Sequence, residues 1–311
     1  MPVVVCAYGE VGHAGLAELL DLGADVALVV THADAPGEKI WFRSVAELAR
    51  AAGVPTIMPD DVNADDAVAA IAAVHPDFLF SFYFRQMMKP RVLALPSRGA
   101  FNLHGSLLPR YRGRAPVNWV LVHGETETGL TLHEMDAKPD HGAIVAQRRV
   151  AIARDDTALT LTRKLAAAAR LLLRETYPAL AAGTAPRLEQ DHTTSSYFGG
   201  RRPADGAIDW TRPAEAIRNL VRAVTDPWPG AFASLRGRKL FVWAAEVRGV
   251  TTAAAPGTVL ASPEGGVLVA TGEGALELVD VSWDGGARAS GAAWARSAAI
   301  AAGERFDATA V

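Results

Sequence analysis

Cysteine is almost absent from this chain, since Cys6 is the only one among its 311 residues. A single cysteine excludes a disulfide within the chain and a metal site built from several thiolates. The sequence also lacks an apolar run near the ~20 residues of a membrane span. Its apolar segment 3–7 is too short for a secretory signal and has no basic cluster before it. We therefore expect a cytoplasmic protein with no part in the membrane.

A strong excess of charge is absent as well, because the formal net charge is only −3. This balance gives no general attraction to nucleic acid or to anionic lipid. The histidines other than His104 show no H-x-x-x-H pair or other spacing typical of metal ligands, so we expect no metal ion.

Short apolar runs alternate with helical patterns over the first two-thirds of the chain. The strands are expected at 3–8, 26–31, 78–82, 99–104 and 130–135. The helices are expected at 16–22, 44–52, 117–123 and 156–181. This alternation with short connections predicts a doubly wound, mostly parallel α/β sheet of the Rossmann-like kind.

The pattern changes after residue 203. One short helix near Pro213 is followed by short strands between glycine-rich turns, at 240–243, 257–260, 266–270 and 275–281. Such spacing is typical of a small, OB-like β-barrel. We therefore predict a catalytic domain with its linker over 1–203 and a barrel domain over 204–311, with a surface helix within 287–303.

Three glycines, Gly9, Gly12 and Gly15, follow the first strand as in a dinucleotide-binding turn. Their spacing is not G-x-G-x-x-G, and the second strand runs into Thr31 and His32 rather than an acidic residue. The glycines therefore predict a tight strand-to-helix turn, and an NAD-binding Rossmann protein stays only as an alternative.

The strand at 99–104 carries Asn102 and His104, two residues apart and followed by a Gly-Ser-Leu-Leu-Pro loop. Residues i and i+2 of a strand project from the same face, so both side chains are expected to point together at the carboxyl end of the sheet. An amide donor beside an imidazole can stabilise an oxyanion while a proton moves. The pair therefore predicts an enzyme that performs acyl chemistry.

Two further groups follow in loops. Asp140 lies in a Pro-Asp-His-Gly loop, where it either forms a turn or serves as a carboxylate partner of His104. Arg114 follows Arg110 and Arg112 in a run that is either a solvated basic face or a grip for phosphate or carboxylate, and Arg114 is the preferred candidate.

The segment from Asn102 to Pro109, together with Asp140, resembles the signature of the 10-formyltetrahydrofolate-dependent formyltransferases. The resemblance extends over the whole chain, and it implies that Asn102, His104 and Asp140 are catalytic. It also implies 10-formyltetrahydrofolate as the co-substrate and no metal. The positions that match the family's folate-binding residues are Gln86, Met87, Met88, Arg114, Asp136, Ala137, Lys138, Pro139 and Asp140.

Within that family the chain resembles most the formyltransferase half of the bifunctional polymyxin-resistance proteins. The matching segments include the loop 31–39, residues 101–119 and residues 222–230. This resemblance implies a nucleotide-sugar substrate, UDP-4-amino-4-deoxy-L-arabinose, and a role in lipid A modification. The sequence stops at Val311 without the dehydrogenase-decarboxylase half of those proteins, so a separate UDP-glucuronate dehydrogenase-decarboxylase is expected in the same pathway.

The main alternative is a methionyl-tRNA formyltransferase, which has the same architecture. Those enzymes hold tRNA with a basic loop after the second strand, whereas the loop from Asp34 to Lys39 is short and acidic here. Acidic residues also outnumber Lys and Arg from Ala204 onward, and a tRNA-binding surface should be positive. A non-catalytic module that binds single-stranded nucleic acid through its barrel would leave the Asn102, His104 and Asp140 set unexplained.

Overall fold

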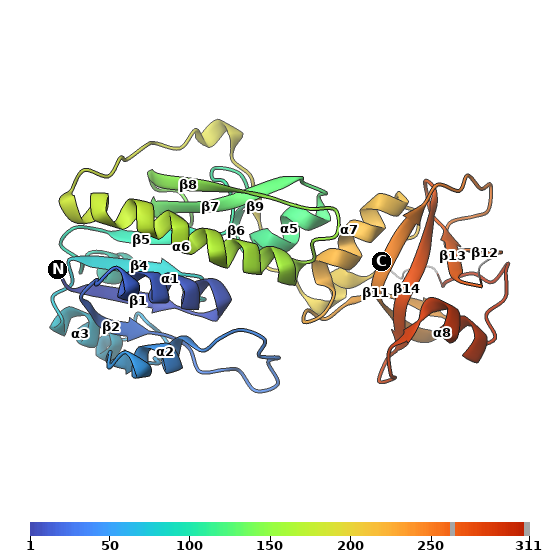
Figure 1. Cartoon of the computed structure of the whole chain (residues 1–311), viewed down its shortest axis with the longest axis horizontal. Coiled ribbons are helices and arrows are strands. Elements are labelled where there is room, and N and C mark those ends of the chain that lie inside the picture. The colour runs from blue at the N-terminus through green and yellow to red at the C-terminus, as the bar shows by residue number, and fades with distance from the viewer. Residues whose placement is uncertain (262–264, 308–311) are drawn as a thin grey trace. The chain divides into compact units, whose positions relative to one another are not determined.

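The computed structural model describes residues 1–261 and 265–307 and contains two compact units (Figure 1). The first unit comprises Met1–Pro116, Thr126–Ile152 and Thr160–Gly199. The second comprises Val117–Glu125, Ala153–Leu159 and the chain from Gly200 onward. Residues 262–264 and 308–311 of the predicted 204–311 domain lie outside the described residues.

The first unit is built on a seven-stranded sheet with the order β3-β2-β1-β4-β5-β7-β8. Its strands are β1 (Val3–Ala7), β2 (Val26–Val30), β3 (Thr56–Ile57), β4 (Phe78–Phe82), β5 (Ala100–His104), β7 (Glu127–Glu134) and β8 (Ile144–Ala151). The first five strands in this order are parallel, whereas β7 and β8 continue the sheet antiparallel. The prediction of a mostly parallel α/β sheet is confirmed.

Helices cover both faces of this sheet. On one face Val4, Cys6 and Leu79 pack with α3 (Asp65–Ala73) and α4 (Pro90–Leu93). On the other face the Phe80 ring lies 6.3 Å from that of Tyr177, in the long helix α6 (Ala158–Ala182). Strands buried on both faces explain why their sequences are continuously apolar. The remaining helix of the βαβ units, α2 (Val45–Ala51), begins after the Ser44 cap, as the sequence predicted.

Helix α1 (Gly9–Asp21) begins seven residues before the helix predicted at 16–22. The glycine-rich segment that suggested a turn is helical because α1 packs closely on the sheet. A Cβ atom at Gly15 would lie 2.6 Å from the Phe82 ring, and one at Gly12 would lie 3.0 Å from the Phe82 carbonyl oxygen. These two glycines therefore permit close packing of the helix on β4.

The second unit contains a curled antiparallel sheet with the order β10-β11-β14-β13-β12, and β15 pairs with β14. Its strands are β10 (Ala231–Leu235), β11 (Arg238–Arg248), β12 (Val259–Leu260), β13 (Val267–Ala270), β14 (Ala275–Trp283) and β15 (Ala289–Ser290). The helices are α5 (Pro116–Val122), α7 (Ala214–Val224) and α8 (Gly291–Ser297). The prediction of a small, barrel-like second domain is confirmed, although the sequence did not reveal β10.

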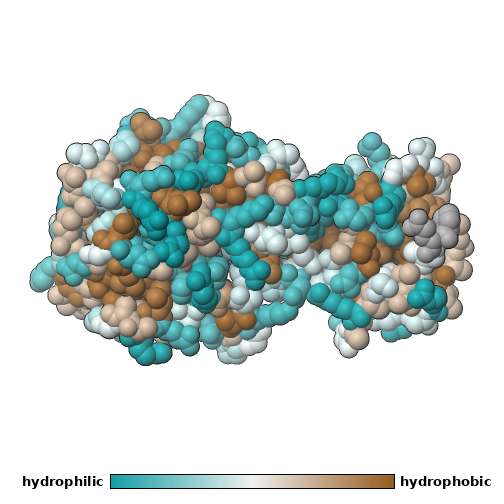
Figure 2. All heavy atoms as spheres, in the orientation of Figure 1, coloured by the Kyte–Doolittle hydropathy of each residue, from teal (hydrophilic) through white to brown (hydrophobic). Residues whose placement is uncertain are grey.

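Short elements complete the chain: β6 (Arg112–Gly113) pairs with β9 (Tyr197–Phe198), and two 3₁₀ turns lie at η1 (His192–Thr194) and η2 (Pro203–Gly206). On the face drawn in Figure 2, hydrophilic side chains are interspersed with small apolar groups. None of the helices in the described part of the chain has the length and apolar character to span a bilayer.

Candidate active site

Strand β5 places Asn102 and His104 at the carboxyl end of the parallel part of the sheet. Its neighbour β4 pairs in parallel, so Ser81 lies beside Asn102. Its other neighbour β7 pairs antiparallel, with His133 opposite Asn102 and Thr131 opposite His104. Asn102 and His104 therefore lie on one face of β5, as their spacing predicted.

The loop after β7 brings Asp140 to this pair. Its Oδ1 lies 3.4 Å from Nδ1 of His104 and accepts a hydrogen bond of 3.3 Å from Nδ2 of Asn102. Its Oδ2 accepts a hydrogen bond of 2.8 Å from the Gly113 backbone N–H. The three residues that the resemblance named as catalytic are thus in contact, although Asp140 is 36 to 38 positions along the chain from the other two.

The Asp140 carboxylate is buried, with 10% of its side chain exposed. Burial alone would raise the pKa of this carboxyl group, but attraction to the His104 imidazole, the neighbouring His133 ring and the hydrogen bond from the Gly113 N–H outweigh it. The pKa of Asp140 is therefore held well below its usual range. The group is a fixed negative charge next to His104.

Hydrogen bonding defines which nitrogen of His104 can change its protonation. Nε2 lies 2.7 Å from the Tyr111 carbonyl oxygen, which can only accept, so Nε2 carries a hydrogen. Nδ1 is therefore the nitrogen that gains or loses a proton, and it faces Asp140. A carboxylate at that distance stabilises a proton on Nδ1 through Coulomb attraction.

His133 also belongs to this cluster, and sequence reasoning missed it. Its Nδ1 donates to the Glu134 carbonyl oxygen at 2.7 Å, which leaves Nε2 as an acceptor. That Nε2 lies 3.2 Å from Nδ2 of Asn102 and 3.5 Å from Oδ1 of Asp140. The signal that could have revealed it is the antiparallel pairing of β5 and β7, which a single sequence does not display.

The arginine run after β5 divides into two kinds of side chain. Arg112 is buried, and its guanidinium donates to Oε1 of Gln190 and lies 2.8 Å from Nδ1 of His192. Arg114 is exposed, and its guanidinium pairs with no residue of the part that the structure describes. Arg114 is therefore the arginine of these two with a guanidinium available to an anion.

The other positions expected to bind folate lie in two loops. Gln86 accepts a hydrogen bond from the Val62 N–H at 2.6 Å, Met87 is exposed, and Met88 is buried in the core. The exposed loop 136–139 is ordered by Asp136, whose carboxylate accepts from the Lys138 N–H and from Nδ1 of His141. The side chains of Gln86 and Met88 thus serve the fold, which leaves the exposed Met87 side chain and the backbone of 86–88 available to a ligand.

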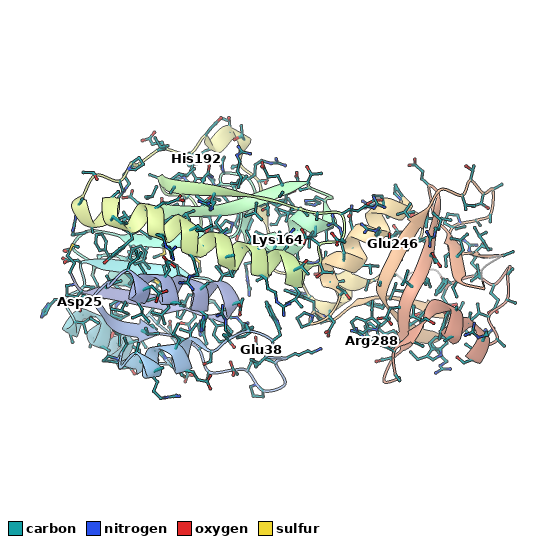
Figure 3. All side chains as sticks on the ribbon, viewed as in Figure 1. Asp25, Glu38, Lys164, His192, Glu246 and Arg288 are labelled. Carbon is teal, nitrogen blue, oxygen red and sulfur yellow. The ribbon has the colours of Figure 1, made fainter. Side chains whose placement is uncertain are left out.

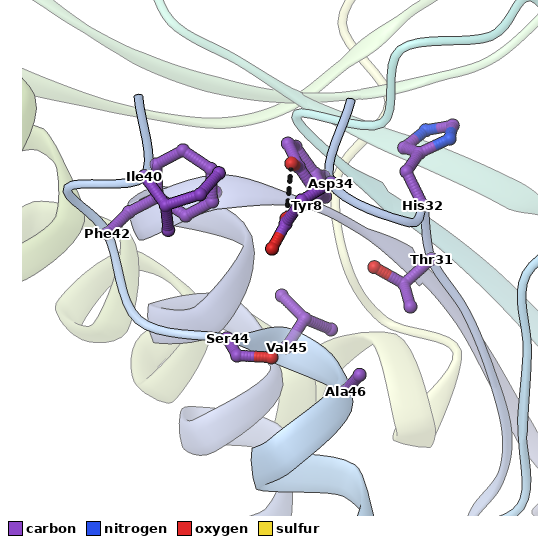
Figure 4. Close-up of a pocket in the computed structure, with 10 residues that line it drawn as sticks. Tyr8, Thr31, His32, Asp34, Ile40, Phe42, Ser44, Val45 and Ala46 are labelled. Atoms are coloured by element: carbon purple, nitrogen blue, oxygen red, sulfur yellow. Dashed lines mark hydrogen bonds between the residues drawn. The ribbon is translucent and has the colours of Figure 1, made fainter. Parts of the chain in front are cut away.

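A small hollow of about 30 Å³ lies at the carboxyl ends of β1 and β2 (Figure 4). The lining residues are Tyr8, Gly9, Thr31, His32, Asp34, Ile40, Phe42, Ser44, Val45 and Ala46. Tyr8 donates to Asp34 at 2.8 Å and to Glu38 at 3.2 Å, and Glu38 also accepts from Arg85. Both carboxylates of the loop after β2 are therefore bound to neighbouring side chains.

Over the described ranges 1–261 and 265–307, no group of three or more His, Cys, Asp or Glu is arranged to hold a metal ion. The site is built instead from an amide, two imidazoles and one carboxylate. Such a set can donate hydrogen bonds to a developing negative charge and can carry a proton.

Residues 7–176 match the family Formyl transferase, and residues 201–299 match the family Formyl transferase, C-terminal domain. The chain belongs to the formyl transferase family and is a formyltransferase. This confirms the family that the Asn102–Pro109 signature indicated.

Three solved structures share the fold. WlaRD, a sugar 3N-formyl transferase in the presence of dTDP and 5-N-formyl-THF, has a TM-score of 0.70 and 18% identity, over 89% of this chain and 96% of that one. An N-formyltransferase from Helicobacter canadensis with folinic acid and dTDP-3-aminofucose gives 0.68 and 19%, over 89% and 98%. A sugar N-formyltransferase from a Shewanella species gives 0.62 and 19%, over 78% and 96%.

Proposed function

We propose that this enzyme transfers the formyl group of 10-formyltetrahydrofolate to the amine of a nucleotide sugar. The contact of the Asp140 carboxylate with both His104 and Asn102 carries the proposal, because it joins a proton carrier to an amide donor at the carboxyl end of the sheet. The solved relatives described with folates and a dTDP-amino sugar support the same pair of substrates.

In the reaction, the amine nitrogen of the sugar bonds to the formyl carbon, and the carbonyl oxygen becomes an oxyanion. Asn102 donates to that oxyanion, and one such donor is typically worth about 3–4 kcal/mol of barrier. Both amide N–H groups of Asn102 are directed at His133 and Asp140, so one of these bonds is exchanged for the oxyanion. The exchange is local because it needs no backbone movement.

His104 moves the proton. The attacking amine loses a proton, and the departing N10 of the folate gains one when the bond from N10 to the formyl carbon breaks. His104 accepts and returns this proton through Nδ1, an effect of about 10²–10⁴-fold in rate. Asp140 stabilises the charged ring and remains ionised throughout. The products are the N-formyl sugar nucleotide and tetrahydrofolate.

The folate is proposed to bind along 86–88, Arg114 and 136–140. Arg114 is the exposed guanidinium in this set, so it is suited to a carboxylate or phosphate of a reactant. The catalytic domain would comprise residues 1–203, with residues 204–311 as the accessory barrel-like domain.

For the acceptor we propose UDP-4-amino-4-deoxy-L-arabinose, which links the reaction to lipid A modification and polymyxin resistance. The proposal rests on the sequence resemblance and on the loop after β2, whose Asp34 and Glu38 are bound to Tyr8 and Arg85. An acidic loop held against the sheet is a poor surface for tRNA phosphates.

A competition assay tests this function. The purified protein receives 10-formyltetrahydrofolate and either UDP-4-amino-4-deoxy-L-arabinose or methionylated initiator tRNA, and product is measured by mass. We expect formylation of the sugar nucleotide and not of the tRNA. Asn102→Ala, His104→Ala and Asp140→Ala are each expected to lower turnover by about 10²-fold or more while the protein stays folded. Formylation of the tRNA alone would contradict the proposed sugar acceptor and identify the protein's substrate as the tRNA.

A further inference from the structure

The segment 188–198, between α6 and the second unit, passes over the loops that hold the active site. In Figure 1 it leaves the end of α6, runs past β8 and returns to β9, and Figure 3 shows His192 on its outer part. Leu188 bridges to Ile144 at the start of β8, and Tyr197–Phe198 pair with Arg112–Gly113. The segment is therefore hydrogen-bonded to the loops on both sides of the site.

Gln190 joins this segment to both loops through hydrogen bonds of its side chain. Its side chain amide is buried, with 6% exposure. Oε1 accepts from Nη2 of Arg112 at 2.6 Å and from Nε at 3.3 Å. Nε2 donates to the carbonyl oxygens of Asp140 at 3.0 Å and of Gly142 at 2.7 Å. Both N–H groups of this amide are therefore used, and both bond to the backbone of the loop that carries Asp140.

Asp140 needs this support because its backbone is in an unfavourable conformation. Its φ is +53°, in the left-handed region that costs a non-glycine residue about 1–2 kcal/mol. The loop has little freedom on its other side, since a Cβ at Gly142 would lie 2.2 Å from the Glu134 carbonyl oxygen. The two bonds from Gln190 hold the Asp140–His141 and Gly142–Ala143 peptides and so restrict the direction in which the Asp140 side chain leaves the loop.

We propose that Gln190 is a positioning residue for Asp140, and this inference rests on the proposed function. It holds the Asp140 carboxylate against His104 and Asn102 although it is 50 positions away from Asp140 in the chain. Arg112 and His192 orient the Gln190 amide in turn, because the Arg112 guanidinium bonds to both. Displacement of a catalytic group by about 1 Å can cost ~10²-fold in rate, so loss of Gln190 should be measurable in turnover.

Two substitutions test the hydrogen bonds of the Gln190 side chain. Gln190→Met keeps the volume and removes every hydrogen bond. Gln190→Glu keeps an acceptor for Arg112 but loses the donors to Asp140 and Gly142. If Gln190 positions Asp140, both variants lose kcat by about tenfold or more per folded molecule.

A matched control is Asn118→Leu. Asn118 is also a buried amide that donates to a backbone carbonyl, that of Ala223, at 2.7 Å, but it lies in the second unit. This variant should lose stability while kcat per folded molecule stays at the wild-type value. Equal effects of Asn118→Leu and Gln190→Glu on kcat would overturn the inference, because they would indicate a general loss of structure.

A second readout needs no substrate. NMR signals of the His104 imidazole, assigned by their absence in His104→Ala, report its contact with Asp140. We expect these signals to shift in both Gln190 variants and not in Asn118→Leu. Unchanged signals would overturn the positioning role whatever the activity, whereas shifted signals in a protein that formylates no sugar nucleotide would overturn only the proposed function.

Discussion

Asn102 lies opposite His133 across the β5–β7 ladder, with 3.2 Å between Nδ2 of Asn102 and Nε2 of His133. The His133 ring is fixed by its bond to the Glu134 carbonyl oxygen, so its Nε2 presents a lone pair to the amide. A turn of 180° about the last side-chain bond exchanges the oxygen and the NH2 group of a carboxamide with little change in shape. The acceptor on His133 therefore selects the orientation in which Asn102 presents N–H groups to the site.

His133→Phe is predicted to lower kcat by about 10- to 100-fold, the equivalent of one hydrogen bond to a charged network. The variant should fold, because a ring still fills the site. His133→Gln retains an acceptor and should recover part of the rate. Steady-state kinetics check both values, and a His133→Phe enzyme with wild-type kcat would show that Asn102 is oriented without it.

Gly105→Ala is predicted to destabilise the first unit by about 1–3 kcal/mol through overpacking. A Cβ there would lie 2.1 Å from the Tyr83 hydroxyl oxygen, which is buried and has no hydrogen-bond partner among the described residues. Tyr83→Phe alone should be neutral or slightly stabilising, because it removes an unsatisfied polar group.

In the double variant Gly105→Ala/Tyr83→Phe, the cost of the alanine should be smaller than in Gly105→Ala. Denaturant unfolding of the four proteins measures this coupling. Gly249→Ala serves as the control, since a Cβ at this position would meet no described atom within 4 Å and its φ is not positive. Strictly additive effects would refute the contact between residues 83 and 105.

Glu18→Gln is predicted to lower the melting temperature near pH 7, and the difference from wild type should shrink in acid. The Glu18 carboxylate in α1 is buried and accepts from Arg170 at 2.7 Å and from Arg174 at 2.6 Å, both in α6. Burial raises its pKa, but the bonds from the two arginines outweigh burial and leave the pKa lowered.

The sign follows from that direction. A pKa that is lower in the folded protein stabilises it at pH values above the unfolded value, about 4.3. The contribution is lost as the pH falls through the lowered folded value. Thermal melts between pH 7 and pH 3 therefore test the prediction. The exposed pair of Glu175 with Arg148 provides the control, because Glu175→Gln should change little at any pH.

Cys6 should be unreactive in the native protein. It lies in β1 with no exposed surface, and burial raises the pKa of its thiol far above its usual range. A chromogenic thiol reagent should label one group per chain only after unfolding in guanidinium chloride. Rapid labelling of the native protein would mean that the centre of the sheet opens readily.

Local patterns were sufficient to predict the sheet, because strands buried on both faces have continuous apolar sequences. The strand predicted at 78–82 coincides with β4, and Asn102 and His104 share a face for reasons of spacing alone. Strand β8 was missed because it lies at the edge of the sheet, and its pattern includes the exposed Gln147 and Arg149. The predicted start of helix α1 was too late in the sequence, because close packing of the helix on the sheet overrides the preference of glycine for turns.

The site was predictable only in part. Asp140 was assigned to His104 through the family resemblance, since nothing in the spacing of the two residues brings them together. His133 and Gln190 had no such signal. His133 is placed by the register of two antiparallel strands, and Gln190 by a connection that reads as a polar linker between domains. Both depend on long-range pairing, which local propensity does not encode.

The connection after α6 therefore has a consequence for protein engineering and for comparison of relatives. The family match to the first unit ends at residue 176, within α6. The hydrogen bonds that hold the catalytic loop come from Gln190, which lies beyond that match. Substitutions between α6 and Phe198 that look like neutral drift in a spacer would alter turnover. Exchanges of the chain from Gly200 onward between homologues should be joined after Phe198, so that each catalytic loop keeps the Gln190 of its own chain.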